Sequence, residues 1–396
     1  MTDLILLLDI GTTTISADII DSKGSKSLAR GVVLNAQHEI GEDIISRIDF
    51  AIKSRQNALI LQKKAANSVS RLIKRLLRES SIKSKDIKKV FCACNSAMHH
   101  ILLGIDTLPL ITPPYRINQK SEIIVCADMI GLDIRKNLKV TFLPNIGGFV
   151  GSDALCAILA SRIYMSKDLR VVIDIGTNGE IIVGNINRML VASTAAGPAF
   201  EARYIKNGMP ALKGAIAGVR IKDNHVKLDV IGRTEPKGIT GSGLIDACYQ
   251  LYQNGFIDRS GRMRAKEFIL YKKGKKKIVV TQSDIRKLQL AKGAMLAGMK
   301  VLLRRYKADS SDIKQIMLTG SFGSQLNAES VIGIGLTPKI NIKRVKYIQS
   351  AVLKGLRLWA RDKSIRDNIF SMLAKTEHVP LFGKAFGKEF AQSLQF

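Results

Sequence analysis

Two segments of the chain end an apolar run with aspartate and continue with glycine and hydroxyl residues. Residues 6–14 read LLLDIGTTT, and residues 171–179, 165 positions later, read VVIDIGTNG. Each apolar run is typical of a strand buried on both faces, and each glycine marks a turn into a second strand. Such a turn brings a carboxylate, backbone N–H groups and hydroxyls to one point, which is the chemistry that holds a polyphosphate. We therefore expect a duplicated fold with a nucleotide site formed by the two hairpins.

The charge of each group in these hairpins indicates its role. A carboxylate cannot hold an anion by itself, so Asp9 and Asp174 are predicted to bind a Mg²⁺ ion that carries the phosphates. A carboxylate at a buried strand end must be solvated, paired or metal-bound. The packing of the core alone therefore does not explain why both hairpins have an aspartate at this position. The phosphate donors are predicted to be the residues that follow the two aspartates, namely Gly11, Thr12, Thr13, Gly176, Thr177 and Asn178.

Two further glycine-rich turns complete the predicted nucleotide site. Residues 238–243 (GITGSG) open a predicted helix and offer N–H groups to an anion or a ribose. Residues 318–323 (LTGSFG) follow a strand and precede another predicted helix, so their backbone is expected to lie against a purine and its ribose. A tight structural turn is the alternative for each segment taken alone. The residues predicted to contact the nucleotide here are Gly241, Ser242, Gly320, Ser321 and Gly323.

Hydrolysis of a bound triphosphate needs a group that orients water in line with the γ-phosphate. Asp153 and Glu180 are the candidates for this catalytic role. Asp153 stands at the start of a predicted helix, where capping is the competing role. Glu180 follows the second hairpin turn, where an exposed position on the strand is the alternative.

The first hairpin begins an α/β lobe that is predicted over residues 1–165. Periodic apolar residues predict its strands and helices. A long helix is predicted from an apolar stripe, opposite basic residues, that consists of Ala65, Val69, Leu72, Ile73, Leu76 and Leu77. The other predicted elements are strands over 15–21, 30–35, 89–94 and 140–143, a turn at 22–24, and helices over 96–103 and 153–165, the last capped by Ser152 or Asp153.

A second lobe with insertions is predicted over residues 166–396. Its predicted elements are strands from 171, over 189–193 and over 313–319, a β-rich stretch over 217–231, helices over 243–253 and 283–306, and a lysine-rich hairpin tip at 272–277. Two α/β lobes predict a cleft between them in which the nucleotide binds.

The composition excludes several classes of protein. The chain has 396 residues, of which 46% are hydrophobic and 6% aromatic, which is typical of a globular protein and not of a disordered one. No apolar run reaches the roughly 18–20 residues that span a bilayer, and no basic residues precede the apolar N-terminal stretch, so neither an anchor nor a signal peptide is expected. Five cysteines without paired spacing predict neither disulfides nor a zinc site, and indicate a reducing cytoplasm.

Basic residues outnumber acidic ones by a wide margin. The chain has 62 Lys and Arg against 33 Asp and Glu, a formal net charge of +29. The lysines are spread along the chain, and no zinc-finger or aromatic RNA-binding pattern accompanies them, so specific binding of nucleic acid is not predicted. A solvated basic surface that steers an acidic protein or a nucleotide is the alternative.

Three other features receive structural interpretations. His99 and His100 begin a short predicted helix, and a capped or solvent-facing pair is favoured over contact with a bound cofactor. Cys92 and Cys94 point to the same face of a strand and are expected in the core. Glu201 is interpreted as a cap or ion-pair partner as readily as a ligand contact, and it is left out of the catalytic set.

Longer motifs connect the chain to a known family. The hairpins at Asp9 and Asp174 and the turn at Gly320 resemble the phosphate and adenosine motifs of the superfamily of acetate and sugar kinases, Hsp70 and actin. Six segments extend the pattern: GEDIISRI at 41–48, NSAMHH at 95–100, LPNIGGFVG at 143–151, DIGTNGEI at 174–181, STAAGPAFE at 193–201 and GITGSGLIDA at 238–247. From about residue 4 to residue 336 the chain resembles the ATPase part of the reductive activators of corrinoid proteins.

That resemblance implies duplicated RNase H-like lobes and an ATPase, with ATP and Mg²⁺ as cofactors. The ATPase would assist reduction of a corrinoid protein or corrinoid methyltransferase from Co(II) to Co(I) for methyl transfer. Because the five cysteines lack ferredoxin spacing, no iron–sulfur cluster is expected in the chain, and a separate ferredoxin-like protein is expected to supply the electron. A homodimer is left open. The alternatives are a small-molecule kinase of the same superfamily, with Asp153 as its base, and a nucleotide-binding relative that does not hydrolyse ATP.

Overall fold

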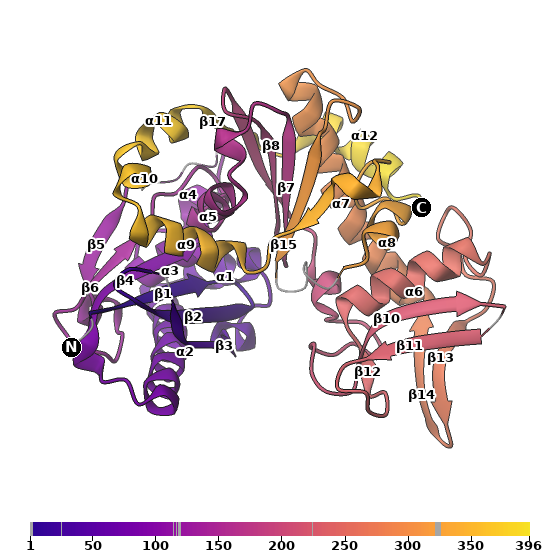
Figure 1. The fold of residues 1–396 in the computed structure, drawn as a ribbon, viewed down its shortest axis with the longest axis horizontal. Helices are drawn as coiled ribbons and strands as arrows, with labels where there is room; N and C mark the ends of the chain where they lie inside the picture. The colour runs from indigo at the N-terminus through magenta and orange to yellow at the C-terminus, as the bar shows by residue number, and fades with distance from the viewer. Residues whose placement is uncertain are drawn as a thin grey trace. The chain divides into compact units, whose positions relative to one another are not determined.

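The computed structural model describes residues 3–24, 26–113, 115, 117, 120–223, 225–320 and 326–396. The chain forms two compact units (Figure 1). The first unit contains Met1–Tyr164 and Ser350–His378, and the second contains Met165–Gln349 and Val379–Phe396. Residues 350–378, which the sequence analysis assigns to the second lobe, therefore cluster with the first unit.

Six strands form the sheet of the first unit. They are β1 (Leu4–Ile10), β2 (Thr14–Asp21), β3 (Ser27–Leu34), β4 (Ile87–Cys94), β5 (Ile123–Cys126) and β6 (Lys139–Phe142). Their order is β3-β2-β1-β4-β6-β5. Strands β1 to β3 form an antiparallel meander, β4 and β6 continue parallel to β1, and β5 is antiparallel to β6.

Helices cover both faces of this sheet. Helix α2 (Arg55–Ser80) packs on β2 and β3 through its buried apolar stripe, as the periodicity predicts. Helices α5 (Ser152–Ser161) and α9 (Ala351–Arg361) pack together on the other face, where Arg357 of α9 pairs with Asp18 of β2 at 2.8 Å. The other segments are η1 (Ala36–Glu39), α1 (Ile44–Ala51), η2 (Ser84–Asp86), α3 (Ser96–Leu103), α4 (Leu108–Ile111), η3 (Ala127–Ile130), η4 (Ile163–Met165), α10 (Lys363–Asp367), α11 (Ile369–Ala374) and β17 (Thr376–His378).

The second unit repeats this plan. Five of its strands, in the order β16-β15-β7-β8-β9, belong to one sheet: β7 (Arg170–Ile175), β8 (Gly179–Gly184), β9 (Met189–Thr194), β15 (Gln315–Gly320) and β16 (Val345–Tyr347). Strands β7 to β9 form an antiparallel meander, and β15 and β16 continue parallel to β7. The order β9-β8-β7-β15-β16 is the order β3-β2-β1-β4-β6 of the first unit, so the duplication predicted from sequence is confirmed.

A long helix again connects the meander to the next parallel strand, but an insertion precedes it. Helix α7 (Gln282–Tyr306) packs on β8 and β9, as α2 packs on its own meander. The insertion contains η5 (Pro198–Glu201), β10 (Ala215–Lys222), β11 (His225–Val230), β12 (Gly238–Ile239), α6 (Gly241–Gln253), β13 (Glu267–Lys273) and β14 (Lys276–Thr281). It forms a three-stranded sheet in the order β11-β10-β12, with α6 packed on β10, and a separate hairpin of β13 and β14.

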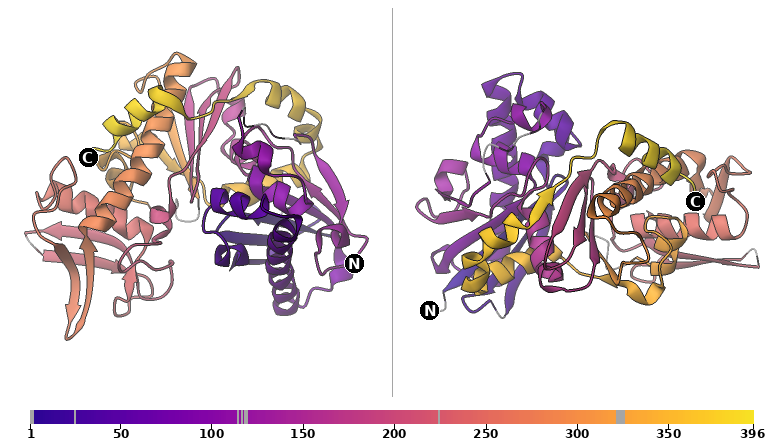
Figure 2. Two further views of the ribbon diagram at one scale, coloured as in Figure 1. Left: turned by 180° about the vertical axis from the view of Figure 1, so that it is seen from behind. Right: turned by 90° about the horizontal axis from the view of Figure 1, so that it is seen from above.

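The C-terminal segment of the second unit lies along α7. Helix α12 (Gly383–Ser393) packs against α7, and both views of Figure 2 show the two helices side by side. Glu389 of α12, with 7% of its surface exposed, pairs with Arg304, and Lys292 donates from Nζ to the Ser393 carbonyl at 2.8 Å. The remaining helical segments of this unit are α8 (Ala328–Gly333) and η7 (Ile342–Arg344), and α8 begins where the sequence predicts.

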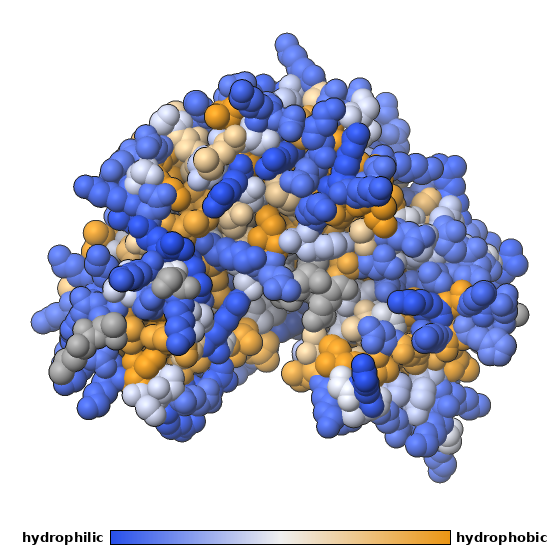
Figure 3. Space-filling model, in the orientation of Figure 1, coloured by the Kyte–Doolittle hydropathy of each residue, from blue (hydrophilic) through white to orange (hydrophobic). Residues whose placement is uncertain are grey.

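The face of the molecule shown in Figure 3 is largely hydrophilic, with apolar residues in small groups. This agrees with the high proportion of lysine and arginine in the chain. Within the described ranges, no helix combines the length and apolar character that crossing a membrane requires.

Candidate functional site

The first hairpin turn is attached to the neighbouring parallel strand. Asp9 is the residue before the last of β1, and Thr12 and Thr13 in the turn are only 7% and 9% exposed. Asn95 stands between β4 and α3, and its Nδ2 donates to Thr12 Oγ1 at 3.1 Å. The Asn95 Oδ1 also accepts the Met98 N–H as the cap of α3, so one side chain fixes both the turn and the helix.

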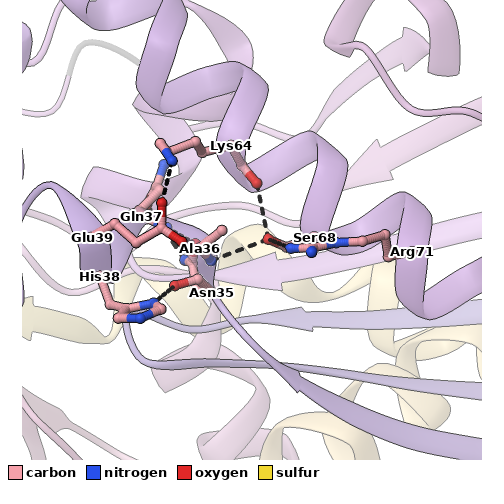
Figure 4. A network of polar contacts seen from close by, with 8 residues as sticks. All are labelled: Asn35, Ala36, Gln37, His38, Glu39, Lys64, Ser68 and Arg71. Carbon is pink, nitrogen blue, oxygen red and sulfur yellow. Dashed lines mark hydrogen bonds and ion pairs between the residues drawn. The ribbon is translucent and has the colours of Figure 1, made fainter.

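The residues that follow β3 connect the first turn to α2, and Figure 4 shows their contacts with Lys64 and Ser68 of that helix. The Asn35 backbone N–H donates to the Thr13 carbonyl at 2.9 Å, and its side-chain Nδ2 donates to the Gly11 carbonyl at 3.0 Å. The next residue, Ala36, donates its N–H to Ser68 Oγ of α2 at 3.1 Å. The predicted phosphate-binding residues of the first hairpin are therefore held by Asn35, which follows β3, and Asn95, which follows β4, and Ser68 of α2 holds the residue next to Asn35.

Asp153 lies at the same end of the first sheet as Asp9. Ser152, the first residue of α5, accepts the Cys94 N–H at 3.0 Å and donates to the Cys94 carbonyl at 3.1 Å through its Oγ. This fixes the start of α5 to the end of β4, the strand that pairs with β1. The pKa of the Cys94 thiol is raised mainly by burial and further by nearby negative charges that include Asp153 and Asp9. The structure thus brings together two of the carboxylates that the sequence singles out.

Gly151 allows this contact between α5 and β4. A Cβ at Gly151 would lie 2.2 Å from the Cys94 carbonyl oxygen and 2.6 Å from Asn95 Cα, which no side chain tolerates. Gly151 is the N-cap of α5, and Asp153 is the second residue of the helix. The predicted cap at Ser152 or Asp153 is therefore wrong, because the close backbone approach leaves room only for glycine at the capping position. The helix also ends earlier than predicted, at residue 161.

A row of polar side chains crosses four strands of the second sheet. Asp174 of β7 is paired with Glu180 of β8, Glu180 with Ser193 of β9, and Asp174 on its other side with Thr319 of β15. Directly paired residues project from the same face of a sheet. Ser193 Oγ donates to Glu180 Oε1 at 3.2 Å, and Glu180 is only 6% exposed. Glu180 is therefore not the exposed strand residue that the alternative interpretation requires.

The carboxyl group of Asp174 has a raised pKa. Burial raises the pKa of Asp174 to about 6, although the Ile175 N–H lowers it by hydrogen bonding. When the charged form of a carboxylate is disfavoured in the folded protein, a bound cation stabilises that charged form. Carboxylate oxygens are ligands that Mg²⁺ prefers. In the part of the chain that the structure describes, no cluster of three or more His, Cys, Asp or Glu could hold a metal by itself.

Thr177 in the second turn is held by a residue from another loop. Thr177 Oγ1 donates to Glu201 Oε1 at 2.9 Å, and Thr177 is 6% exposed. The other Glu201 oxygen lies 3.9 Å from Arg203 Nε. Gly176 and Asn178 complete the turn between β7 and β8. Glu201, which the sequence analysis leaves out, therefore orients the hydroxyl of a predicted phosphate-binding residue.

The glycine-rich turn before α6 is closely packed. Thr240 caps the helix, because its Oγ1 accepts the Gly243 N–H at 3.0 Å, and it lies 2.8 Å from Ser242 Oγ. A Cβ at Gly241 would lie 1.8 Å from the Phe200 carbonyl oxygen of η5. Ser242 is 1% exposed. Close packing thus accounts for Gly241, and nucleotide contact by Gly241 and Ser242 stays a prediction.

Gly320 lies beside the second hairpin. It pairs with Ile175, the residue after Asp174, and a Cβ at Gly320 would lie 2.2 Å from the Ile175 carbonyl oxygen. Its φ of +117° is in the region that favours glycine. Ser321 and Gly323, also predicted to contact the nucleotide, lie outside the described residues.

The two histidines of the NSAMHH segment are buried, so the solvent-facing interpretation is wrong. His99 and His100 are both 0% exposed. Burial lowers the pKa of His99 to about 3, and burial is also the largest cause of the lowered pKa of His100. The His99 ring meets the Phe142 ring edge-on with centroids 5.6 Å apart. The face of α3 that carries His99 therefore packs against the core of the first unit. Cys92 and Cys94 are buried in the core, as predicted.

Asn35, Asn95 and Ser193 contact the predicted site residues but escaped the sequence analysis, which considered Glu201 only as a cap, an ion-pair partner or a ligand contact. Asn35 and Asn95 each stand directly after a strand and before a helix, and this capping position is a signal that could have found them. Ser193 and Glu201 had no comparable local signal, because their partners are 13 and 24 residues away in the chain.

Two family descriptions together match most of the chain. The RACo middle region matches residues 5–166, and the C-terminal domain of RACo, its ASKHA domain, matches residues 168–396. The ASKHA match agrees with the fold class predicted from the sequence, that of the superfamily of actin and the sugar kinases.

Individual relatives agree with this match. Corrinoid activation enzyme RamQ of Eubacterium limosum is 31% identical over 400 residues, which cover 95% of this chain and 67% of that protein. The Co(II) methylated amine-specific corrinoid protein reductase of Methanosarcina barkeri is 22% identical over 402 residues, covering 93% and 72%. The solved reductive activator for corrinoid, iron-sulfur protein has a TM-score of 0.93 at 32% identity, covering 100% of this chain and 66% of that one. This chain spans about two thirds of the length of these relatives. The chain belongs to the RACo family of corrinoid activators, through both its middle region and its ASKHA domain.

Proposed function

We propose that this protein is an ATPase that assists the reduction of a corrinoid protein from Co(II) to Co(I), the state used in methyl transfer. One electron from a separate ferredoxin-like donor reduces the cobalt, and ATP is hydrolysed to ADP and phosphate. The observation that carries the proposal is the pair of acid-tipped hairpins. Asp9 and Asp174 end equivalent strands of two sheets with the same strand order, in a chain of the RACo family.

Both hairpins contribute to ATP binding in this proposal. Asp9 and Asp174 hold Mg²⁺, which when bound neutralises the phosphate charge. Thr12, whose hydroxyl accepts from Asn95 Nδ2 and keeps its own proton, donates to a phosphate oxygen together with the backbone N–H groups of both turns. Thr177, whose hydroxyl donates to Glu201, holds the second turn in place. The raised pKa of the partly exposed Asp174 carboxyl group supports this role.

Glu180 and Asp153 are proposed to orient the attacking water. Glu180 lies on the same sheet face as Asp174 and is held by Ser193, so its carboxylate is positioned beside a metal-binding carboxylate. In the first unit Asp153 lies at the same end of the sheet as Asp9 for a different reason, because α5 begins where β4, the strand paired with β1, ends. Fixed groups of this kind need no reorganisation when charge develops on the phosphate.

The burial of four of the five cysteines supports a separate electron donor. Burial raises the pKa of the Cys92, Cys94, Cys156 and Cys248 thiols. Iron–sulfur clusters are held by thiolates, and a thiol whose pKa is raised in this way is a poor source of thiolate. The electron is therefore proposed to reach the corrinoid protein from another polypeptide.

The test is phosphate release from Mg²⁺ and ATP, combined with the absorbance of Co(I) in a mixture of corrinoid protein and reduced ferredoxin. Wild type is expected to release phosphate and to raise the yield of Co(I). Asp9→Asn and Asp174→Asn are each expected to lower kcat/KM for ATP by about 100-fold or more. Asp168→Asn, a substitution at an exposed position of the second unit, is the matched control and is expected to behave as wild type.

Other outcomes would contradict the proposal in distinct ways. ATP binding without phosphate release indicates a nucleotide-binding relative that does not hydrolyse ATP. A phosphorylated metabolite in place of inorganic phosphate indicates a small-molecule kinase. Phosphate release that does not change the yield of Co(I) separates the ATPase from the corrinoid reaction.

A further inference from the structure

The insertion in the second unit is not needed for the duplicated fold. The first unit passes from β3 to α2 through residues 35–54, whereas the second unit passes from β9 to α7 through residues 195–281. The two sheets nevertheless have the same strand order. The hairpin of β13 and β14 extends away from the sheet of its own unit (Figure 1). A projecting element that the repeated core does not require is a candidate for a binding function.

The tip of this hairpin concentrates positive charge. Residues 272–277 read KKGKKK, and all five lysines are exposed. Lys273 and Lys276 pair with Glu235 at 3.5 and 3.2 Å, and Lys277 pairs with Glu267. Lys272 and Lys275 have no ion pair within the described ranges. Lysines that lie next to or opposite one another on paired strands repel, so this cluster of lysines does not stabilise the hairpin.

Two neighbouring loops extend the charged surface. The Lys237 N–H donates to the Gly214 carbonyl at 2.7 Å, and the Gly214 N–H donates to the Ile231 carbonyl at 2.9 Å, which joins loop 212–214 to loop 231–237. Glu235 of the second loop joins both to the hairpin tip. We name the three segments 212–214, 231–237 and 272–277 the basic face. It carries eight Lys and Arg residues and one Glu.

We propose that the basic face docks an acidic surface of the corrinoid protein that the chain activates, an inference that rests on the proposed function. A cluster of one sign of charge raises the local concentration of an oppositely charged partner and orients its approach. Leu212, which is 61% exposed at the edge of this surface, supplies an apolar contact of the kind that protein interfaces bury.

A protein partner fits the basic face better than a nucleic acid does. Single-stranded nucleic acids bind where exposed aromatic rings stack on bases. The hairpin has two aromatic residues, Phe268 and Tyr271, and both pack against the core of the unit. Phe268 lies with its ring centroid 4.8 Å from that of Phe256. The tip itself is wholly hydrophilic in the view of Figure 3 and contains lysine but no arginine, the residue that most often reads bases.

The test measures binding separately from ATP hydrolysis. The double variant Lys272→Glu and Lys275→Glu is compared with Lys83→Glu and Lys85→Glu, two exposed lysines of the first unit that serve as the control. Association with the Co(II) corrinoid protein, with poly-L-glutamate and with a 20-base-pair DNA duplex is followed by fluorescence anisotropy at low and high salt. The hairpin variant is expected to bind the corrinoid protein and poly-L-glutamate about tenfold more weakly at low salt, with phosphate release unchanged. The control pair is expected to bind like wild type, and added salt is expected to reduce the difference.

Each contrary result overturns the inference. Equal binding of wild type and hairpin variant to the corrinoid protein places the docking surface elsewhere. Binding of the DNA duplex that is tighter than binding of poly-L-glutamate, and that is lost in the hairpin variant, makes the basic face a nucleic-acid site. If the chain activates no corrinoid protein, the proposed function fails, and the poly-L-glutamate series alone decides whether the basic face binds acidic protein chains.

Discussion

Asp174 and Glu180 lie directly opposite each other on neighbouring antiparallel strands, so both side chains project from one face of the second sheet. In the first sheet the residue opposite Asp9 is Ser16. The first turn has four residues between Ile10 and Ile15, one more than the second turn, and this extra residue shifts the pairing. The duplicated hairpins are therefore chemically unequal, because only the second pairs its strand-end aspartate with another acid.

Replacing Glu180 by Gln is expected to lower kcat for ATP hydrolysis by about 100-fold. Glutamine keeps the shape and the contact with Ser193 but removes the negative charge that is proposed to orient water. The affinity for ATP, measured by equilibrium binding, should stay within a few-fold of wild type, because Asp174 is unchanged. Ser193→Ala, which removes only the hydrogen bond to Glu180, is the control, and it should lower kcat for ATP hydrolysis by about tenfold or less. Hydrolysis by Glu180→Gln at the wild-type rate would assign the water-orienting role to Asp153 instead.

Replacing Asp174 by Asn is expected to stabilise the ligand-free protein near neutral pH. The raised pKa of Asp174, about 6 against 3.8, means that the folded state binds more protons than the unfolded state between these values. The folded state therefore loses stability as pH rises through this window. The Asp174→Asn variant does not lose this stability, because asparagine does not titrate. The free energy of unfolding in urea should rise by about 1–2 kcal/mol at pH 7.5. A decrease, or an equal rise for the exposed Asp168→Asn, would show that the buried charge is not the cause.

The buried His99 is expected to make the protein sensitive to acid. Its pKa is about 3 in the folded protein against 6.5 in the unfolded chain, so the unfolded state binds more protons between these pH values. The free energy of unfolding should then decrease as pH falls below 6.5, by about 1 kcal/mol per pH unit from this residue. In a plot of the free energy of unfolding against pH, His99→Gln should reduce the slope below pH 6.5. His225→Gln, at an exposed position, should leave that slope unchanged. Parallel profiles for wild type and His99→Gln would contradict the assignment.

Adding one methyl group at Gly151 is expected to disturb the first unit. The Cβ of Gly151→Ala would meet backbone atoms of β4 and Asn95, which cannot move aside as a side chain can. The expected loss is about 1–3 kcal/mol in the free energy of unfolding, with a fall in kcat because α5 carries Asp153. Gly387→Ala in α12 is the control, since nothing lies within 4 Å of its Cβ, and it should stabilise the chain by about 0.5–1 kcal/mol. Equal thermal midpoints for the two variants would refute the packing argument.

Local patterns in the sequence predict most of the scaffold of the site. The repeated acid-tipped hairpins, the stripe of α2 and the helix at 96–103 appear in the structure as predicted, because each depends on a short periodicity or on a turn residue. The helices after residue 350 were not predicted. Whether α9 joins the first or the second unit depends on which sheet its apolar face covers, and no local pattern records that choice.

The sequence by itself determined which residues are proposed to carry the chemistry, because Asp9 and Asp174 stand in a repeated motif whose turn residues are adjacent in the chain. Only the tertiary structure decided their neighbours. Strand register placed Glu180 beside Asp174, and the contact between α5 and β4 placed Asp153 near Asp9. It also turned His99 into the core and brought Glu201 to Thr177. The physical reason is that pairing register and backbone approach between distant segments depend on the packing of the whole unit.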